Sequence, residues 1–487
     1  MGKYQYKFQM YKDLQLNIPQ IYADAKKAAD EIGIPKEIRG KFGLTGAISG
    51  CPAPLRKDIM EASEKGGHEV IPLATLVEQL REVVKSVYGD QWEPIPTSTC
   101  EAALWMTFDS LMTPPNLGRG DNYRARYIAP LEKHLHHQGG YGRPFPAKYK
   151  DIFADRGTTA GELGFYGKRQ NNLDAVFVPL EGGVYANHGI KSWPTFSLTG
   201  VDAEASAKRI AKVAEQQAAF VTGFASLAYD TPGYGYAQKD EKGAPLLQKR
   251  IGEIAKSMNV PYLVDNAWGL PFVGTNPNDI NADVIVYAMD KATGSATSGL
   301  AIAKEDVATN LRRAMGLAGD RYGTTASYGK AAFVTFDPGK EALLTQIVAL
   351  KALRDKPEIY KKPVDDLYNI IVEELKALPE SVRKGIMVTK SYNSTAVEIN
   401  YEGTWANGQM GLPIFSIEDM YAGSNIFQTG CAQMGIIPTI AYDGNIFVSP
   451  GLGTSDENGQ IKDQEMRWAV KGLVALIGIV AKFVGLA

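Results

Sequence analysis

Two ionisable side chains stand at the ends of neighbouring apolar runs in the middle of this sequence. The run Tyr262–Val264 ends in Asp265, and the run Val284–Ala288 is followed three residues later by Lys291. Short apolar runs of this length are typical of buried strands in a parallel sheet. Open α/β sheets bind their ligands at the carboxyl ends of the strands, so we expect the carboxylate and the amine to face one site.

A lysine and an aspartate placed in this way are the two groups that pyridoxal 5′-phosphate (PLP) chemistry requires. The lysine amine forms a Schiff base with the aldehyde of the cofactor, and the carboxylate keeps the pyridine nitrogen protonated, so that the ring can accept electrons from the substrate. Ala267, two residues after Asp265, is small enough to let the ring lie flat against the strand. The sequence therefore predicts PLP, with Lys291 and Asp265 as catalytic residues.

A third element of such a site is an anchor for the phosphate group. The hydroxyl cluster Thr97-Ser98-Thr99 and Cys100 directly precede an apolar helix expected over residues 101–112. The first N–H groups of a helix have no partner within the helix, and its N-terminus carries a partial positive charge, so it favours anions. We therefore expect the cofactor phosphate at this turn.

The segment from Val264 to Gly269, together with Asp290 and Lys291, resembles fold-type I PLP-dependent enzymes, which share the aspartate-aminotransferase fold. The similarity is greatest to the branch of group II decarboxylases and O-phosphoseryl-tRNA(Sec) selenium transferases. The resemblance implies an α/β fold, with a three-layer αβα large domain around a mostly parallel sheet and a small C-terminal α+β domain. It also implies a homodimer whose subunits complete each other's sites.

The resemblance also implies further contacts with the cofactor. Tyr185 and His188 are both candidates for the residue over the pyridine ring, and His188 is equally well interpreted as a structural histidine. Contacts to the phosphate, to the cofactor O3′ and from a neighbouring subunit are implied at these positions: Thr97, Ser98, Thr99 and Cys100 for the phosphate, Ser226, Asp230 and Thr231 for O3′, and Thr324 and Thr325 for the neighbouring subunit.

The sequence departs from the family pattern at the substrate. Aminotransferases usually present an arginine to the substrate carboxylate from the C-terminal domain, but residues 445–451 contain none. We therefore expect a lyase, β-replacement or decarboxylase reaction at Cα or Cβ of an amino acid or related amine. An aminotransferase, a tRNA-dependent selenium or sulfur transferase, and a non-catalytic PLP-binding assembly protein are the alternatives.

Composition excludes several other classes of protein. The 52 basic and 54 acidic residues leave a net charge of -2, which disfavours a nucleic-acid partner. Cys51, Cys100 and Cys431 are odd in number and far apart, which indicates free thiols in a reducing cytoplasm rather than disulfides. The cluster His134-Leu135-His136-His137 lacks a regular carboxylate pattern, so we predict no metal site. The apolar C-terminal tract 473–487 is too short to span a membrane and is expected to form a packed helix.

The distribution of apolar patterns predicts three regions. Residues 1–95 are expected to form an N-terminal helical arm, residues 96–338 the PLP-binding large domain with an insertion at 113–172, and residues 339–487 the small domain. Alternating strands and helices indicate βαβ units in the large domain. The expected strands are 175–179, 218–222, 262–264, 284–288, 299–302, 395–399 and 445–448, and the expected helices include 203–215, 246–258, 341–353 and 364–377.

Overall fold

The large part of the molecule is built around a seven-stranded sheet. The computed structural model describes residues 3–45, 54–112, 126–132, 174–187, 194–316, 333, 336–408, 411–413, 425–438, 440–442 and 444–487. Within these residues the strand order is β1-β9-β8-β7-β6-β2-β3, and only β9 runs against the others. The strands are β1 (Trp92–Thr97), β2 (Arg126–Pro130), β3 (Asp174–Val178), β6 (Val221–Leu227), β7 (Tyr262–Asp265), β8 (Val284–Ala288) and β9 (Gly299–Lys304).

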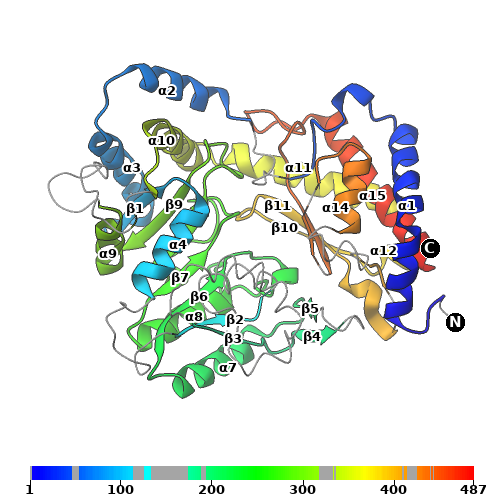
Figure 1. The fold of residues 1–487 in the computed structure, drawn as a ribbon, viewed down its shortest axis with the longest axis horizontal. Coiled ribbons are helices and arrows are strands. Elements are labelled where there is room, and N and C mark those ends of the chain that lie inside the picture. The colour runs from blue at the N-terminus through cyan, green and yellow to red at the C-terminus, as the bar shows by residue number, and fades with distance from the viewer. Residues whose placement is uncertain are drawn as a thin grey trace.

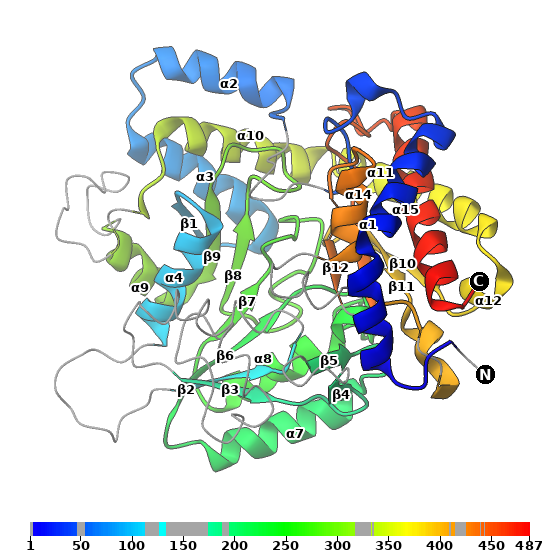
Figure 2. The same ribbon diagram turned by 45° about the vertical axis from the view of Figure 1, so that its right-hand side comes forward.

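Helices cover this sheet (Figures 1 and 2). α4 packs on β1, β8 and β9, α7 packs on β2 and β3, and α8 packs on β6 and β7. This alternation of strand and helix is the α/β architecture that the sequence predicts, which confirms the expected fold class. The helices of this part are α2 (Lys57–His68), α3 (Leu73–Tyr88), α4 (Cys100–Leu111), α7 (Ala203–Gln216), α8 (Leu246–Ser257), α9 (Glu305–Met315) and α10 (Lys340–Asp355).

A smaller antiparallel sheet forms the second part, with the strand order β10-β11-β13-β12. Long helices pack against it on the right of Figure 2, and the first and last helices, α1 and α15, lie side by side. Its elements are β10 (Met387–Ser391), β11 (Ala396–Asn400), β12 (Ile440–Tyr442), β13 (Asn445–Val448), α1 (Lys7–Ile32), α11 (Glu358–Glu374), α12 (Glu380–Arg383), α14 (Ile426–Gln433) and α15 (Asp463–Val484). A separate hairpin pairs β4 (Val184–Asn187) with β5 (Pro194–Ser197).

The chain has two hydrophobic cores, and their residues do not follow the three regions expected from the sequence. Buried residues of α2, α3 and α10 join the core of the large sheet. Buried residues of α1 and of 34–44 instead join the core of the small sheet, together with α11, α14 and α15. The N-terminal arm is therefore shared between both cores, and α10, which we expected to begin the small domain, packs with the large one.

The segment expected as an insertion contains a strand that we did not predict. Within residues 113–172, Arg126–Pro130 forms β2, between β6 and β3. Tyr127, Ile128 and Ala129 are fully buried, so burial of this short run outweighs the polar composition around it. Residues 113–125 and 133–172 lie outside the described residues. The strand expected at 218–222 is also displaced, because β6 begins only at Val221.

Strand β1 was not predicted, because it contains Pro94 and Pro96. Proline has no N–H to donate to a sheet, so it is confined to edge strands and strand ends. β1 is the edge of the large sheet and pairs only with β9 among the described strands. The edge position explains how a run with two prolines forms a strand. Thr97 is the last residue of this strand.

The C-terminal tract forms the packed helix that the sequence predicts. Leu473, Leu476, Ile477 and Val480 of α15 are buried in the core of the small sheet. Among the described residues, no helix is both long and apolar enough to cross a membrane.

Candidate active site at the carboxyl ends of the strands

Asp265 and Lys291 follow neighbouring parallel strands. β7 ends at Asp265, which lies opposite Val286 of β8, and Lys291 follows the end of β8 by three residues. Because β6, β7 and β8 are parallel, their carboxyl ends meet at one edge of the sheet. The two predicted groups therefore lie at the same edge of the molecule, where open α/β sheets bind ligands.

Asp265 is held in a nearly enclosed position. Only 5% of the residue is exposed to solvent. Its Oδ1 accepts a hydrogen bond of 3.1 Å from the backbone N–H of Ala267. A buried carboxylate is stable only with hydrogen-bond or ionic partners, so this position favours a cationic or N–H donor facing the carboxylate.

The chain after Asp265 is fixed by a pair of buried amides. Asn266 and Asn393 exchange two hydrogen bonds of 3.0 Å, and Asn393 also donates to the carbonyl of Ala228 at 2.8 Å. A Cβ on Gly269 would lie 2.1 Å from the Asn266 side-chain amide, so only glycine fits there. Asn393 comes from the turn between β10 and β11, so the small sheet holds the strand end that carries Asp265.

Lys291 lies beside an aromatic cluster at the junction of the two sheets. Its Nζ is 5.4 Å from the ring centroid of Trp268, a distance at which a cation interacts with the face of an aromatic ring. Trp268 stacks on Phe447 of β13, with centroids 5.6 Å apart and planes 7° apart. Tyr229 completes the contact, with its centroid 5.6 Å from that of Trp268.

The predicted phosphate turn lies at the end of β1. Thr99 is the N-cap of α4, and its hydroxyl accepts from the N–H of Ala102 at 3.0 Å. The Thr97 hydroxyl donates to the Thr99 carbonyl at 2.8 Å. A Cβ on Gly299 would lie 2.2 Å from that carbonyl oxygen, so glycine allows the turn to lie against β9. The Ser98 N–H donates to the carbonyl of Phe336 at 2.7 Å.

The start of α4 lies at the same edge of the sheet as Asp265 and Lys291. β1 and β8 both pair antiparallel with β9, so they run in the same direction, and β7 is parallel to β8. The turn at 97–100 therefore follows its strand at the same edge as Asp265 and Lys291 follow theirs. Burial raises the pKa of the Cys100 thiol well above the ordinary value, the charge of Asp265 raises it further, and the charge of Lys291 lowers it.

All three predicted contacts with the cofactor O3′ have other partners in the structure. The Ser226 hydroxyl lies 2.6 Å from the hydroxyl of Tyr262, inside the core of the sheet. The Thr231 hydroxyl donates to the buried carboxylate of Glu398 on β11. Asp230 binds Lys239 at 2.8 Å and also accepts from Ser391. Their roles toward a cofactor stay predictions.

The remaining predicted contacts lie where the side chains are not described. Tyr185 is on β4, with its backbone opposite Phe196 of β5. His188, Thr324 and Thr325 lie outside the described residues, as does the histidine cluster at 134–137. The ring-stacking residue and the contribution of a neighbouring subunit therefore stay predictions.

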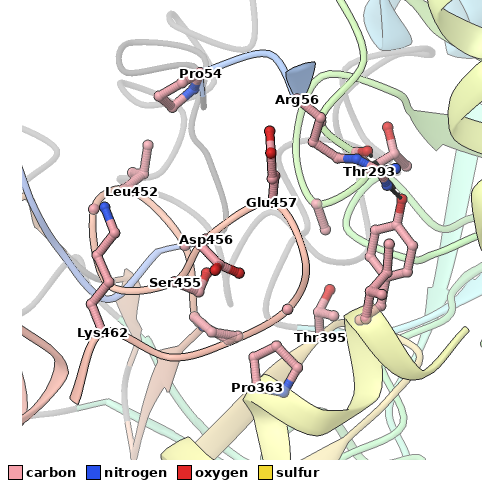
Figure 3. Close-up of a pocket in the computed structure, with 18 of the residues that line it drawn as sticks. Pro54, Arg56, Thr293, Pro363, Thr395, Leu452, Ser455, Asp456, Glu457 and Lys462 are labelled. Carbon is pink, nitrogen blue, oxygen red and sulfur yellow. Dashed lines mark hydrogen bonds between the residues drawn. The ribbon is translucent and has the colours of Figure 1, made fainter. Parts of the chain in front are cut away.

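A cavity next to Lys291 contains residues that we did not predict from the sequence. It has a volume of about 690 Å³ and is lined by Arg56, Tyr360 and Thr395 as well as Lys291 (Figure 3). Arg56 is the residue before α2, and Thr395 precedes β11. The polar run Asn393-Ser394-Thr395 before β11 is typical of a turn and does not by itself indicate a site residue. Arg56 also lacks a sequence signal, since its position depends on contacts distant in the sequence.

Comparison with solved structures identifies the fold. A scan against protein-family models found no match, and a search of curated proteins also found none. A serine palmitoyltransferase structure from Sphingomonas wittichii matches with a TM-score of 0.50 and 12% identity, covering 97% of this chain and 98% of that chain. A ureidoglycine–glyoxylate aminotransferase structure from Bacillus subtilis matches with a TM-score of 0.50 and 11% identity, covering 91% and 98%.

This chain has the aspartate-aminotransferase fold of fold-type I PLP-dependent enzymes. The fold expected from Val264–Gly269 and Asp290-Lys291 is thus confirmed. At this level of identity the similarity concerns the fold alone, so the cofactor, the reaction and the substrate are taken up below as proposals.

Proposed function

We propose that this chain is a PLP-dependent enzyme acting at Cα or Cβ of an amino acid or related amine. The observation that carries the proposal is that Asp265, Lys291 and the turn before α4 each follow the carboxyl end of a strand at one edge of the large sheet. These three elements offer an acceptor for the pyridine nitrogen, an amine for the aldehyde carbon and N–H donors for the phosphate.

The residues present fit the chemical groups of this cofactor. The Asp265 carboxylate is nearly buried and accepts the Ala267 N–H, and a carboxylate has acceptor capacity for a protonated ring nitrogen as well. The turn before α4 combines the Thr99 hydroxyl, which accepts from Ala102 and keeps its own hydrogen to donate, with a helix N-terminus. The Thr97 hydroxyl donates to the Thr99 carbonyl and so fixes the turn. This donor set matches a dianionic phosphate better than it matches a metal ion, which would need several anionic ligands.

When bound, PLP would act as the electron sink for the carbanion formed at the substrate. Lys291 would hold the cofactor until an amino substrate displaces the lysine amine. The freed amine would then move a proton to or from the substrate as a general acid or base. Asp265 would keep the ring nitrogen protonated, and the stacked Trp268 and Phe447 would exclude water from the side of Lys291.

A lyase, β-replacement or decarboxylase reaction is the subtype that we propose. The segment that supplies the substrate arginine in aminotransferases is used here for packing: Phe447 stacks on Trp268, and the Asn445 amide donates to the buried Glu398 at 3.3 Å. We further propose a homodimer, as the resemblance implies.

An absorbance spectrum of the purified protein loaded with PLP tests this proposal. We expect a band near the edge of the visible range that is lost in Lys291→Ala. Lys304→Ala is the matched control, because Lys304 lies at the far end of β9 and pairs with Asp283 at 3.4 Å. Absence of the band from the unaltered protein, or its persistence in Lys291→Ala, would refute the assignment.

A screen for spectral change then separates the reaction classes. Amino acids that shift the band are identified, and their products are determined by mass spectrometry. Loss of carbon dioxide or of a β-substituent supports the proposed subtype, whereas an oxo acid with pyridoxamine phosphate indicates an aminotransferase. A band without turnover of any amine would indicate a PLP-binding assembly protein. Binding of tRNA that weakens steeply as the salt concentration rises would indicate a tRNA-dependent transferase.

A further inference from the structure

Arg56 lines the cavity that borders Lys291, and it comes from the N-terminal part of the chain rather than from the C-terminal domain. We propose that this cavity receives the carboxylate of the amino substrate and that Arg56 binds that carboxylate. The proposal rests on the proposed function, because it assigns the substrate-binding side of the same site. It gives the enzyme a carboxylate site in place of the arginine missing from residues 445–451.

The surroundings of Arg56 leave part of its guanidinium available. Nε and Nη2 donate to the Asp58 carboxylate at 3.1 and 2.5 Å, and Nη1 donates to the Tyr360 hydroxyl. A guanidinium has five N–H donors, so two are left after these three bonds to described residues. The Arg56 side chain is only 14% exposed, which fixes its orientation. A carboxylate could accept both remaining donors in a planar, bidentate pair.

The turn after Lys291 places Arg56 on the wall next to the lysine. Gly294 has φ +73°, and a Cβ there would lie 3.3 Å from both Cγ and Cδ of Arg56. The Tyr360 hydroxyl is 3.5 Å from the carbonyl of Thr293 in the same turn. The arginine stem therefore packs on the segment that begins with Lys291, and both side chains face one cavity.

Thr395 is an independent indication that a ligand binds here. It has φ +47°, which is a strained conformation for a β-branched residue. It is 6% exposed, and its buried hydroxyl has no hydrogen-bond partner among the described residues. A strained backbone and an unsatisfied buried hydroxyl both cost free energy, and such features occur at functional sites. In Figure 3 Thr395 and Arg56 lie on the same side of the cavity.

The charges around the cavity also favour an anion. Four cationic side chains line it, against two acidic ones; both acids and two of the cations belong to exposed residues, whereas Arg56 and Lys291 are partly buried. An excess of positive charge in a partly enclosed cavity raises the local concentration of anionic ligands. The cations are Lys41, Arg56, Lys291 and Lys462, and the acids are Asp456 and Glu457.

Two aminooxy reagents test the assignment without knowledge of the substrate. Aminooxyacetate and O-methylhydroxylamine both displace lysine from bound PLP, and only the first carries a carboxylate. Their nitrogen bonds to the aldehyde carbon of the cofactor and the Lys291 amine leaves, so the absorbance band reports the reaction. We expect the unaltered protein to react with aminooxyacetate at a concentration about 10- to 100-fold lower, the range expected for a charge-assisted hydrogen-bonded pair.

Variants then distinguish a specific role of Arg56 from the general effect of removing a positive charge. In Arg56→Gln we expect this preference to disappear, with an unchanged reaction toward O-methylhydroxylamine. Thr395→Val is expected to reduce the preference and Thr395→Ser to keep most of it. Arg467→Gln is the matched control, because Arg467 pairs with Glu373 at 2.9 Å on α11 and does not line the cavity. A preference that survives in Arg56→Gln would overturn the proposal.

Thermal unfolding with maleate provides a readout that does not depend on cofactor chemistry. Maleate has carboxylates but no amine, so it can occupy the carboxylate site without reacting. We expect maleate to raise the Tm of the unaltered protein and of Arg467→Gln, but not of Arg56→Gln. Equal stabilisation of all three proteins would contradict the role of Arg56. Absence of the PLP band from the unaltered protein would instead refute the proposed function, so the two failures are distinguishable.

Discussion

The strand edge with Asp265 and Lys291 and the cavity wall with Arg56 and Thr395 are built in different ways. At the strand edge, both groups follow consecutive strands of one sheet, 26 residues apart in the sequence. At the cavity wall, Arg56 and Thr395 are more than 300 residues apart and come from the segments before α2 and before β11. The comparison shows that the strand edge can be predicted from local strand patterns, whereas the cavity wall depends on how segments distant in the sequence meet.

The largest loss of activity is expected from a substitution of Asp265, at the strand edge. Asp265→Asn should lower turnover about 10²- to 10⁴-fold, because a neutral amide no longer keeps the ring nitrogen protonated. The PLP band should persist, since Lys291 is unchanged. Turnover of the substrate found in the amino-acid screen measures the effect.

A carboxylate at the other end of the neighbouring strand serves as the control. Asp283 directly precedes β8, and it accepts from the Tyr262 N–H at 2.8 Å. Asp283→Asn should leave turnover within about twofold, because this group lies away from the carboxyl edge. Equal losses in both variants would show that Asp265 has only a structural role.

The next largest effect is a loss of stability when Asn393 is replaced, because this residue links the small sheet to the strand edge. Asn393→Ala removes partners from Asn266, from the Ala228 carbonyl and from the Thr275 N–H, which donates to Asn393 at 3.0 Å. Buried polar groups without partners cost about 1–3 kcal/mol each, so we expect the free energy of unfolding to fall by about 3 kcal/mol. Urea denaturation measures this change.

An exposed asparagine provides the comparison for that variant. Asn310 donates to the carbonyl of Ser110 at 2.9 Å on the surface. Asn310→Ala should change the free energy of unfolding by less than about 0.5 kcal/mol. If Asn393→Ala were equally mild, the amide pair would not couple the small sheet to the strand that carries Asp265.

A smaller effect is expected at the aromatic stack beside Lys291. Phe447→Leu keeps an apolar side chain on β13 but removes the ring that stacks on Trp268. Loss of an aromatic pair should lower the free energy of unfolding by about 1–2 kcal/mol. The quantum yield or wavelength of Trp268 fluorescence should also change. Unaltered stability would show that the stack does not join the two sheets.

The smallest effect is a change of stability with pH that arises from Asp337. This residue follows Phe336, whose carbonyl accepts from the Ser98 N–H. Burial raises the pKa of Asp337 to about 6. The folded state therefore binds this proton more tightly than the unfolded state, so the contribution of Asp337 to stability is most favourable below about pH 4 and falls as the pH rises through about 6. Asp337 is half-buried, so screening reduces the loss to about 1 kcal/mol.

The corresponding variant checks the sign of this pH effect. Asp337→Asn should be about 1 kcal/mol more stable than the unaltered protein at pH 7 and no more stable at pH 4. Urea denaturation at both pH values measures the difference. A stabilisation of the same size at pH 4 would show that the carboxyl proton is not involved.

The sequence predicted most of the large sheet, because strands and helices alternate there with clear apolar patterns. The strand at 284–288 and the helix at 203–215 agree with β8 and α7 within one residue. β2 was missed, because its five residues lie between polar stretches, and β1 was missed because of its prolines.

The candidate site was predicted only as far as local signals reach. Asp265 and Lys291 follow strands that are recognisable in the sequence, and the turn at 97–100 precedes a recognisable helix. Because β1, β7 and β8 run in the same direction, all three lie at one edge of the sheet. Arg56 and Thr395 could not be predicted, since their positions depend on the contact of α11 and the 293–294 turn with the N-terminal segment. Burial between distant segments, rather than local pattern, determines that wall of the cavity.

Reduction with borohydride followed by mass analysis of peptides tests the central claim most directly. Borohydride converts a lysine-bound PLP into a stable amine, so the modified lysine can be located. We predict a phosphopyridoxyl group on the peptide that contains Lys291 and on no other peptide. The same label on a different lysine, or none on protein incubated with PLP, would contradict the account.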